Sequence, residues 1–173
     1  MIRVLVVTVS DSTVAGTRED RSGPAVAARV EQLGWHVTGR ELVPDDSARI
    51  TELLKNASSN SRADVILTTG GTGVAARDVT PEATRAAIDR EIPGLPETMR
   101  YEGRKQTYLA PLSRAVAGIR DRTLIVNLPG SPKGAVESLD AVANLIPHIV
   151  DLLQGRTEHQ PVPRNSPIEK NVP

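Results

Sequence analysis

The amino-acid sequence predicts an α/β sandwich, in which helices pack around a mostly parallel sheet. Short aliphatic runs that suit buried strands alternate along the chain with amphipathic segments that suit helices. Glycines and polar residues gather directly after these strands, as expected where parallel strands end in loops at one edge of a sheet. The chain has 173 residues, which fits one domain comfortably and two domains poorly.

The first half of the chain predicts strands and helices in alternation. The expected strands are the aliphatic runs at residues 2–10, 36–43 and 65–69. A polar loop at 11–21 leads to the first helix, from residue 25 to 33, which Gly34 ends. The second helix starts at a cap formed by Asp46 and Ser47 and fades into a Ser/Asn-rich linker at 58–62.

The second half predicts more helices and one further clear strand. The expected helices are residues 81–91, 97–106 after a Pro/Gly interruption at 93–96, and 135–153 with a kink or restart at Pro147. The clear strand is 123–128, whereas 109–119 suits either a mixed strand or a short helix. We expect one folded domain at residues 1–155. From Arg156 onward prolines stand among polar residues, so 156–173 is expected to be a disordered Pro-rich tail.

Composition excludes several functional classes. A net charge of zero and only 2% aromatic residues argue against nucleic-acid binding by electrostatic attraction or by base stacking. Absence of cysteine excludes disulfides, thiolate metal sites and cysteine nucleophiles, and the three histidines lack a metal-ligand spacing. No apolar run is long enough to span a membrane, and no signal peptide precedes the first strand, so we expect a cytoplasmic protein that does not contact a membrane.

The stretch from residue 64 to 81 carries the strongest functional signal. A buried strand leads into Gly70-Gly71-Thr72-Gly73, where glycines allow positive φ and close approach to a ligand. Arg77-Asp78 follows, and Thr80 is expected to cap the next helix with Pro81 at its first position. This order is typical of a phosphate or nucleotide site. The alternative is a tight strand-to-helix connection that needs glycines only for its geometry.

The remaining chemistry is that of phosphoryl or nucleotidyl transfer. A Walker phosphate loop is absent, and no histidine lies in a strand-end loop to form a Ser-His-Asp triad. Gly71-x-Gly73-x-x-Ala76 matches the dinucleotide fingerprint formally, but it follows the third strand and no helix starts inside it. Asp45 and Asp78 follow strand ends, where carboxylates together with substrate phosphates suit Mg²⁺.

Four motifs together closely resemble the MogA/MoaB family of molybdenum cofactor biosynthesis. They are TTGGTG-(x)3-RDVTPEAT, IPGLPETMR, LSRAVAGIR and NLPGSPK. The same domain also resembles part of gephyrin, of the plant Cnx proteins and of the MoeA proteins, and the resemblance extends from Ile2 to Leu153. It implies a three-layer α/β/α fold, a homotrimer and contact with a MoeA-like molybdenum insertion protein. The implied reaction is Mg²⁺-dependent: the terminal phosphate of molybdopterin takes AMP from ATP, and pyrophosphate is released.

The resemblance also assigns site residues by position in the motifs. Asp45 and Asp78 match the two key aspartates, as catalytic residues and as the candidates to hold ATP-bound Mg²⁺. The residues implied to bind substrate are Asp11, Ser22 and Gly23 of the first loop, Thr69, Gly70, Gly71, Thr72 and Gly73 of the glycine loop, and Pro129, Gly130, Ser131 and Lys133 on the pterin side.

Three hypotheses follow from the sequence. The first is a molybdopterin adenylyltransferase. The second is a non-catalytic, MoaB-like protein that binds molybdopterin on the same fold or serves as a scaffold. The third is a dinucleotide enzyme, which depends on the short glycine pattern alone.

Overall fold

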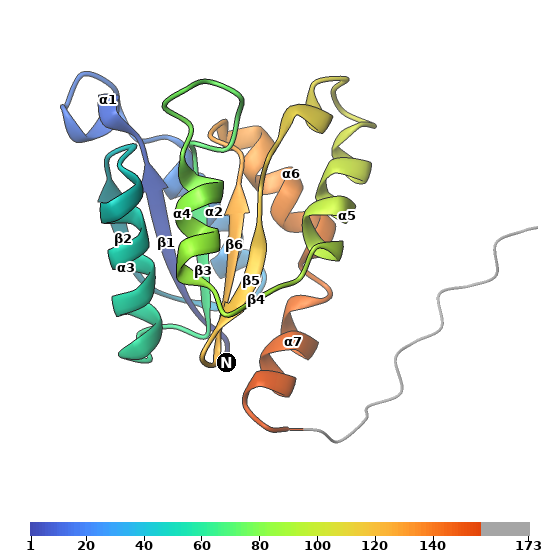
Figure 1. The fold of residues 1–173 in the computed structure, drawn as a ribbon. Coiled ribbons are helices and arrows are strands. Elements are labelled where there is room, and N and C mark those ends of the chain that lie inside the picture. The colour runs from blue at the N-terminus through green and yellow to red at the C-terminus, as the bar shows by residue number, and fades with distance from the viewer. Residues whose placement is uncertain (157–173) are drawn as a thin grey trace, which may run out of the picture.

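A six-stranded sheet forms the centre of the protein, in a computed structural model that describes residues 1–156 (Figure 1). The strand order is β2-β1-β3-β6-β5-β4, with the first four strands parallel and β5 antiparallel to β6 and β4. The strands are β1 (Arg3–Val9), β2 (His36–Val43), β3 (Val65–Thr69), β4 (Arg90–Glu91), β5 (Ala117–Arg120) and β6 (Thr123–Leu128). The mostly parallel sheet confirms the predicted class.

Helices cover both faces of this sheet and make three layers. The helices are α1 (Asp11–Val14), α2 (Ser22–Gln32), α3 (Ser47–Ser59), α4 (Thr80–Ala87), α5 (Gly94–Gly103), the 3-10 turn η1 (Ala110–Leu112), α6 (Pro132–Val142) and α7 (Ile146–Leu153). One buried cluster joins the sheet to α2, α5, α6 and α7. A second joins the opposite face to α3 and α4, which lie in front of the sheet in Figure 1.

Strand β1 shows why a continuous aliphatic run suits this position. Val4 and Val6 enter the cluster on one face, and Leu5 and Val7 enter the cluster on the other, since side chains alternate along a strand. All four side chains are fully buried. The sequence therefore predicted a central strand correctly.

Several element boundaries differ from the sequence prediction. The helix expected at 81–91 ends at Ala87, because Ile88 is extended and the Asp89 amide donates to Ile119 O of β5 at 2.7 Å. The remainder becomes the short strand β4. The loop expected at 11–21 begins with α1, and the linker expected at 58–62 begins only after α3 ends at Ser59. The ambiguous segment 109–119 contains both η1 and the start of β5.

The expected long helix at 135–153 is two helices. Helix α6 starts earlier, at Pro132, and α7 restarts at Ile146 with Pro147 in its first turn, as the proline predicts. No helix within residues 1–156 is long and apolar enough to cross a membrane. The predicted tail, apart from Arg156, lies outside the described residues.

Asp64 ties the amino-terminal ends of the strands together. This side chain, which is 10% exposed, accepts hydrogen bonds from the main-chain amide of Arg3 at 2.8 Å and from its guanidinium at 2.9 Å. Gln154, after α7, donates to the same carboxylate at 3.3 Å. Burial alone would raise the pKa of Asp64, but the hydrogen bonds and charge of Arg3 outweigh it and hold that pKa below its usual range.

Asp64→Asn is expected to lower the free energy of unfolding at pH 7 by roughly 1–3 kcal/mol, because it removes the charge of a nearly buried carboxylate that is hydrogen-bonded to the half-exposed Arg3. A lowered pKa contributes stability above the ordinary value of about 3.9, and this contribution disappears as pH falls through the native pKa. The deficit should therefore shrink below about pH 4. Urea unfolding at several pH values measures it.

Asp151→Asn is the matched control. Asp151 pairs with Arg156, but both side chains are more than half exposed, so the change should stay within about 0.5 kcal/mol. Equal losses in the two variants, or a deficit that does not depend on pH, would contradict the role of Asp64.

Candidate active site

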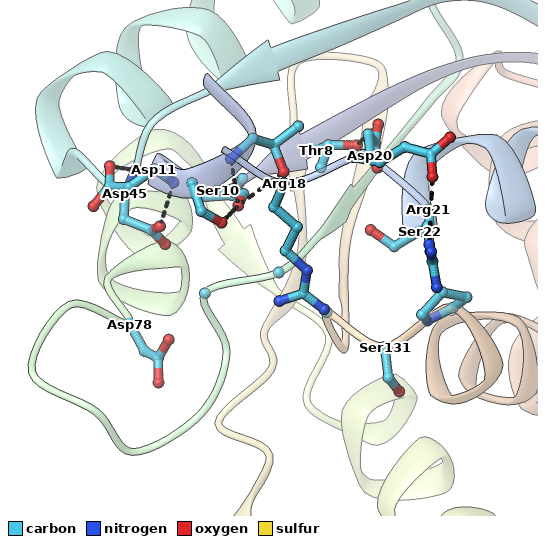
Figure 2. Close-up of a pocket in the computed structure, with 18 of the residues that line it drawn as sticks. Thr8, Ser10, Asp11, Arg18, Asp20, Arg21, Ser22, Asp45, Asp78 and Ser131 are labelled. Carbon is cyan, nitrogen blue, oxygen red and sulfur yellow. Dashed lines mark hydrogen bonds and ion pairs between the residues drawn. The ribbon is translucent and has the colours of Figure 1, made fainter. Parts of the chain in front are cut away.

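A cleft of about 460 Å³ opens where the parallel strands end (Figure 2). Its walls come from the loops after β1, β2, β3 and β6, which the sequence predicted to meet at one edge. The predicted residues that line it are Asp11, Ser22, Asp45, Gly70, Gly71, Asp78, Gly130 and Ser131. We call it the first cleft.

Asp11 and Asp45 fix each other on one wall of this cleft. The Asp11 amide donates to an Asp45 carboxylate oxygen at 2.9 Å, and the Asp45 amide donates to Asp11 at the same distance. The pair therefore locks the end of β2 to the start of α1, where Ser10 accepts from the Thr13 amide as the cap. Figure 2 shows these carboxylates side by side on one wall, with Asp78 on the neighbouring loop.

The environment of Asp45 is unfavourable for its negative charge. Burial raises the pKa of the Asp45 carboxyl above its usual range, and the charges of Asp11 and Asp78 act in the same direction. The amide of Asp11 and the charge of Arg77 oppose this rise. A cation bound beside Asp45 would offset the repulsion.

Asp20 holds the loop that closes the other end of the first cleft. Its carboxylate accepts from the Thr8 hydroxyl at 2.9 Å and from the Gly23 amide at 2.9 Å. This arrangement leaves no room at Gly23, where an added Cβ would lie 2.4 Å from both side chains. A glycine is thus needed at position 23, because Asp20 and Thr8 pack directly against it behind the part of the cleft wall that Ser22 lines.

The glycine loop approaches its surroundings closely enough to exclude side chains. Gly70 has φ +105° and Gly71 has φ +63°, both in the region that favours glycine. A Cβ at Gly70 would lie 2.3 Å from the main-chain oxygen of Val9. Thr80 fixes the position of this loop, because its hydroxyl donates to Gly70 O at 2.9 Å.

Thr80 consequently has a different role from the one the sequence predicted. The N-cap of α4 is Val79, and no side chain caps the helix. Because Thr80 is fully buried beneath the glycine loop, its hydroxyl binds a loop carbonyl rather than a helix amide. The predicted cap is therefore wrong, although the helix start is within one residue.

A second cleft of about 560 Å³ adjoins the first. Gly71, Asp78, Gly130 and Ser131 line both clefts and form a shared wall. Beyond this wall the second cleft is more apolar, since its other lining residues include Met99, Leu109, Ala110, Leu112 and Pro129. Of the predicted residues, Thr72, Gly73 and Pro129 line only this second cleft.

Three predicted binding residues line neither cleft. Gly23 packs behind the first, and the Thr69 hydroxyl donates to Pro129 O at 2.7 Å beneath the wall. Lys133 lies in the first turn of α6, but its side chain is 81% exposed and its ammonium is 3.7 Å from Glu137. Glu137 itself lines the second cleft.

The sequence did not predict most of the cationic residues that line the first cleft or most of the apolar residues that line the second. Arg18 and Arg21 line the first cleft, and Figure 2 shows Arg18 extending from its loop toward the centre. No pattern distinguished them from solvated loop residues. Met99 and Arg100, by contrast, lie within the IPGLPETMR motif, so the resemblance carried a signal for the second cleft.

The donor set of the first cleft suits Mg²⁺ that arrives with a ligand. Among residues 1–156 no group of three or more His, Asp and Glu side chains could hold a metal ion alone. Asp45 and Asp78 both line the first cleft and offer carboxylate oxygens, and Mg²⁺ commonly binds one or two carboxylates plus substrate phosphates. These residues therefore fit the ion as a companion of a nucleotide.

The fold and the site together define an α/β protein whose cleft, at the carboxyl edge of the sheet, suits a phosphorylated ligand. Backbone amides, hydroxyls, cations and a carboxylate pair meet there, and a more apolar cleft adjoins them.

Comparison with known proteins gives the family. Residues 5–148 match the family described as the probable molybdopterin binding domain, and the chain belongs to it. It is 40% identical over 159 residues to a molybdopterin adenylyltransferase of Helicobacter pylori, with 89% of each chain covered. It is 42% identical over 145 residues to the molybdopterin adenylyltransferase of Haemophilus influenzae, covering 82% of this chain and 73% of that protein.

Solved structures agree with this assignment. The molybdopterin biosynthesis enzyme MoaB from Thermus thermophilus matches with a TM-score of 0.84 and 50% identity, over 90% of this chain and 98% of that one. The predicted MogA/MoaB resemblance and the three-layer fold are confirmed.

Proposed function

We propose that this protein is a molybdopterin adenylyltransferase, which transfers AMP from ATP to the terminal phosphate of molybdopterin and releases pyrophosphate. The observation that carries the proposal is the shared wall of the two clefts. It gives a nucleotide and an acceptor adjacent places, so that a group can pass between them without leaving the protein. The named relatives support the same reaction.

The chemistry of the lining divides the substrates between the clefts. The first cleft offers Arg18, Arg21, Arg77 and the glycine-loop backbone, which suit the triphosphate of ATP. The second offers Met99, Leu109 and Leu112, which suit the flat ring system of a pterin. The α-phosphate of ATP and the phosphate of molybdopterin would then meet at the shared wall.

The proposed step is a displacement at phosphorus. A phosphate oxygen of molybdopterin attacks the α-phosphorus of ATP, a new P–O–P bond forms, and the bond to the β-phosphate oxygen breaks as pyrophosphate leaves. Mg²⁺ bound through Asp45 and Asp78 would offset phosphate charge and orient the α-phosphate. The protein supplies mainly positioning and charge stabilisation, as is usual for phosphoryl chemistry.

A non-catalytic molybdopterin-binding protein is the alternative from the same fold. The carboxylates of Asp45 and Asp78 favour catalysis, because binding phosphates alone would be better served by cations than by two anions. The dinucleotide enzyme loses its support, since the glycine loop reaches α4 only at Thr80 and the chain belongs to another family.

Pyrophosphate release is the test. Purified protein with molybdopterin, ATP and Mg²⁺ should release pyrophosphate and form adenylylated molybdopterin, and omission of molybdopterin or chelation of Mg²⁺ should stop both. Molybdopterin binding without any release would instead establish the non-catalytic alternative. Binding of neither substrate would overturn both, and a nicotinamide titration with saturable binding would restore the third hypothesis.

Other consequences of family membership stay predictions. These are the homotrimer, contact with a MoeA-like insertion protein, and a role for Lys133 toward the acceptor phosphate. An exposed lysine at the rim could reach a phosphate that projects from the second cleft, since the ammonium stands on a flexible stem.

A further inference from the structure

One arginine outside both clefts binds the two ends of the loop that carries Asp78. Arg114 lies between η1 and β5, and its Nε donates to Gly73 O at 2.6 Å. Another guanidinium nitrogen donates to Asp78 O. Its main-chain amide donates to Thr72 O at 2.9 Å, just before the loop begins.

Residues 73–78, which we call the Asp78 loop, have few other attachments. Within the loop, the amide of Ala75 donates to the Asp78 carboxylate at 2.9 Å, and the amide of Asp78 donates to Ala75 O at 2.9 Å. These bonds shape the loop but do not join it to the body. In residues 1–156, both hydrogen bonds that connect residues 73–78 to the rest of the chain come from Arg114.

Arg114 is itself anchored to α4. Its guanidinium forms an ion pair with Glu82 in the first turn of that helix. Burial alone would raise the pKa of Glu82, but the hydrogen bond and charge of Arg114 hold that pKa below its usual range. A planar guanidinium can serve two carbonyls and a carboxylate together, which an ammonium cannot do with the same geometry.

We propose that Arg114 is a positioning residue, which holds Asp78 at the shared wall by clamping both ends of its loop to α4. Asp78 lines both clefts, so a small displacement of the loop would move its carboxylate away from the place where the substrates meet. The kinetic consequence rests on the proposed adenylyl transfer. The structural consequence, an ordered Asp78 loop, does not.

A double-mutant cycle tests the kinetic consequence. Arg114→Gln should slow the chemical step, measured by rapid quench with both substrates saturating, by about tenfold to a hundredfold, as displacement of a catalytic group does, while the Kd for ATP changes by less than about threefold. In an Asp78→Asn background the same substitution should cost less than about twofold, because the group it positions is already disabled. Equal losses in both backgrounds would show that Arg114 supports the fold in general, and would overturn the inference.

Amide hydrogen exchange tests the structural consequence without any turnover. In Arg114→Gln, the amides of residues 73–78 should exchange faster, while those of β3 and α6 stay unchanged. Unchanged exchange in the loop would overturn the inference. If wild-type protein released no pyrophosphate, the proposed function would fail, and this measurement would still decide the role of Arg114.

Two further variants complete the experiment. Arg114→Lys keeps the charge without the planar fork, so it should restore folding if Arg114→Gln is unstable and still show faster loop exchange. Arg85→Gln is the matched control on α4. Arg85 pairs with Glu91 at 2.8 Å and touches neither cleft, so loop exchange and the rate of the chemical step should both match wild type.

Discussion

Asp45→Asn and Asp78→Asn are each expected to slow adenylyl transfer by about a hundredfold or more, the scale of losing one electrostatic contact in the transition state. Asparagine keeps the shape of the side chain and removes the charge that would bind Mg²⁺ on ATP. Rapid-quench measurement of adenylylated molybdopterin, with both substrates saturating, isolates the chemical step.

The folded state should tolerate both changes. The pKa of Asp45 is raised by burial and by neighbouring anions, so ionised Asp45 opposes folding at neutral pH, and this effect disappears as pH falls below the usual pKa of aspartate. Asparagine removes that opposition, and the melting temperature at pH 7 should hold or rise. Normal turnover in both variants would show that the two charges are not catalytic, and unfolding of either variant would show that its aspartate is needed for the fold.

Gly70→Ala is expected to have the largest effect on stability among single substitutions near the site. The added methyl would lie 2.3 Å from Val9 O, a main-chain atom of the central strand that has no free space to move into. Backbone strain at φ +105° adds to this clash. We expect a loss of roughly 3 kcal/mol or more in the free energy of unfolding, together with loss of nucleotide binding.

Gly34→Ala separates the steric clash from the backbone strain as causes of the lost stability. Gly34 also has positive φ, at +76°, but nothing lies within 4 Å of its added Cβ. Only strain should remain, about 1 kcal/mol. Denaturant unfolding of both variants measures the difference. Similar losses of unfolding free energy in the two variants would mean that the glycine loop shifts to accommodate a methyl group. The close contact between Gly70 and β1 would then contribute little to stability.

The sequence predicted the centre of the fold better than its edges. Strand β2 has the expected bounds because alternation persists over its full length, and β3 is identified by a run that is buried throughout. Strand β4 has only two residues, too few for any periodicity, and it exists because β5 offers it an edge. Such pairing depends on contacts distant in sequence, which local patterns do not contain.

The site was predictable where backbone geometry required a particular residue. Gly70 and Gly71 stand out because only glycine suits their conformation and close contacts. Arg18 carries no such mark, since an arginine in a polar loop looks the same whether it faces solvent or a cleft. Arg114 was visible only as part of a motif, and its two carbonyl partners are tens of residues away in the chain.

The shared wall has a consequence for the end of the catalytic cycle. The adenylylated product would be a bivalent ligand, with its nucleotide half in the first cleft and its pterin half in the second. Two joined halves are held by avidity, because one half keeps the other at high effective concentration while it is detached. Product should therefore bind more tightly than either substrate, and its departure should limit steady-state turnover. A burst of one product per active site would be seen before the slower phase, whereas linear formation from the start would mean that the halves leave independently.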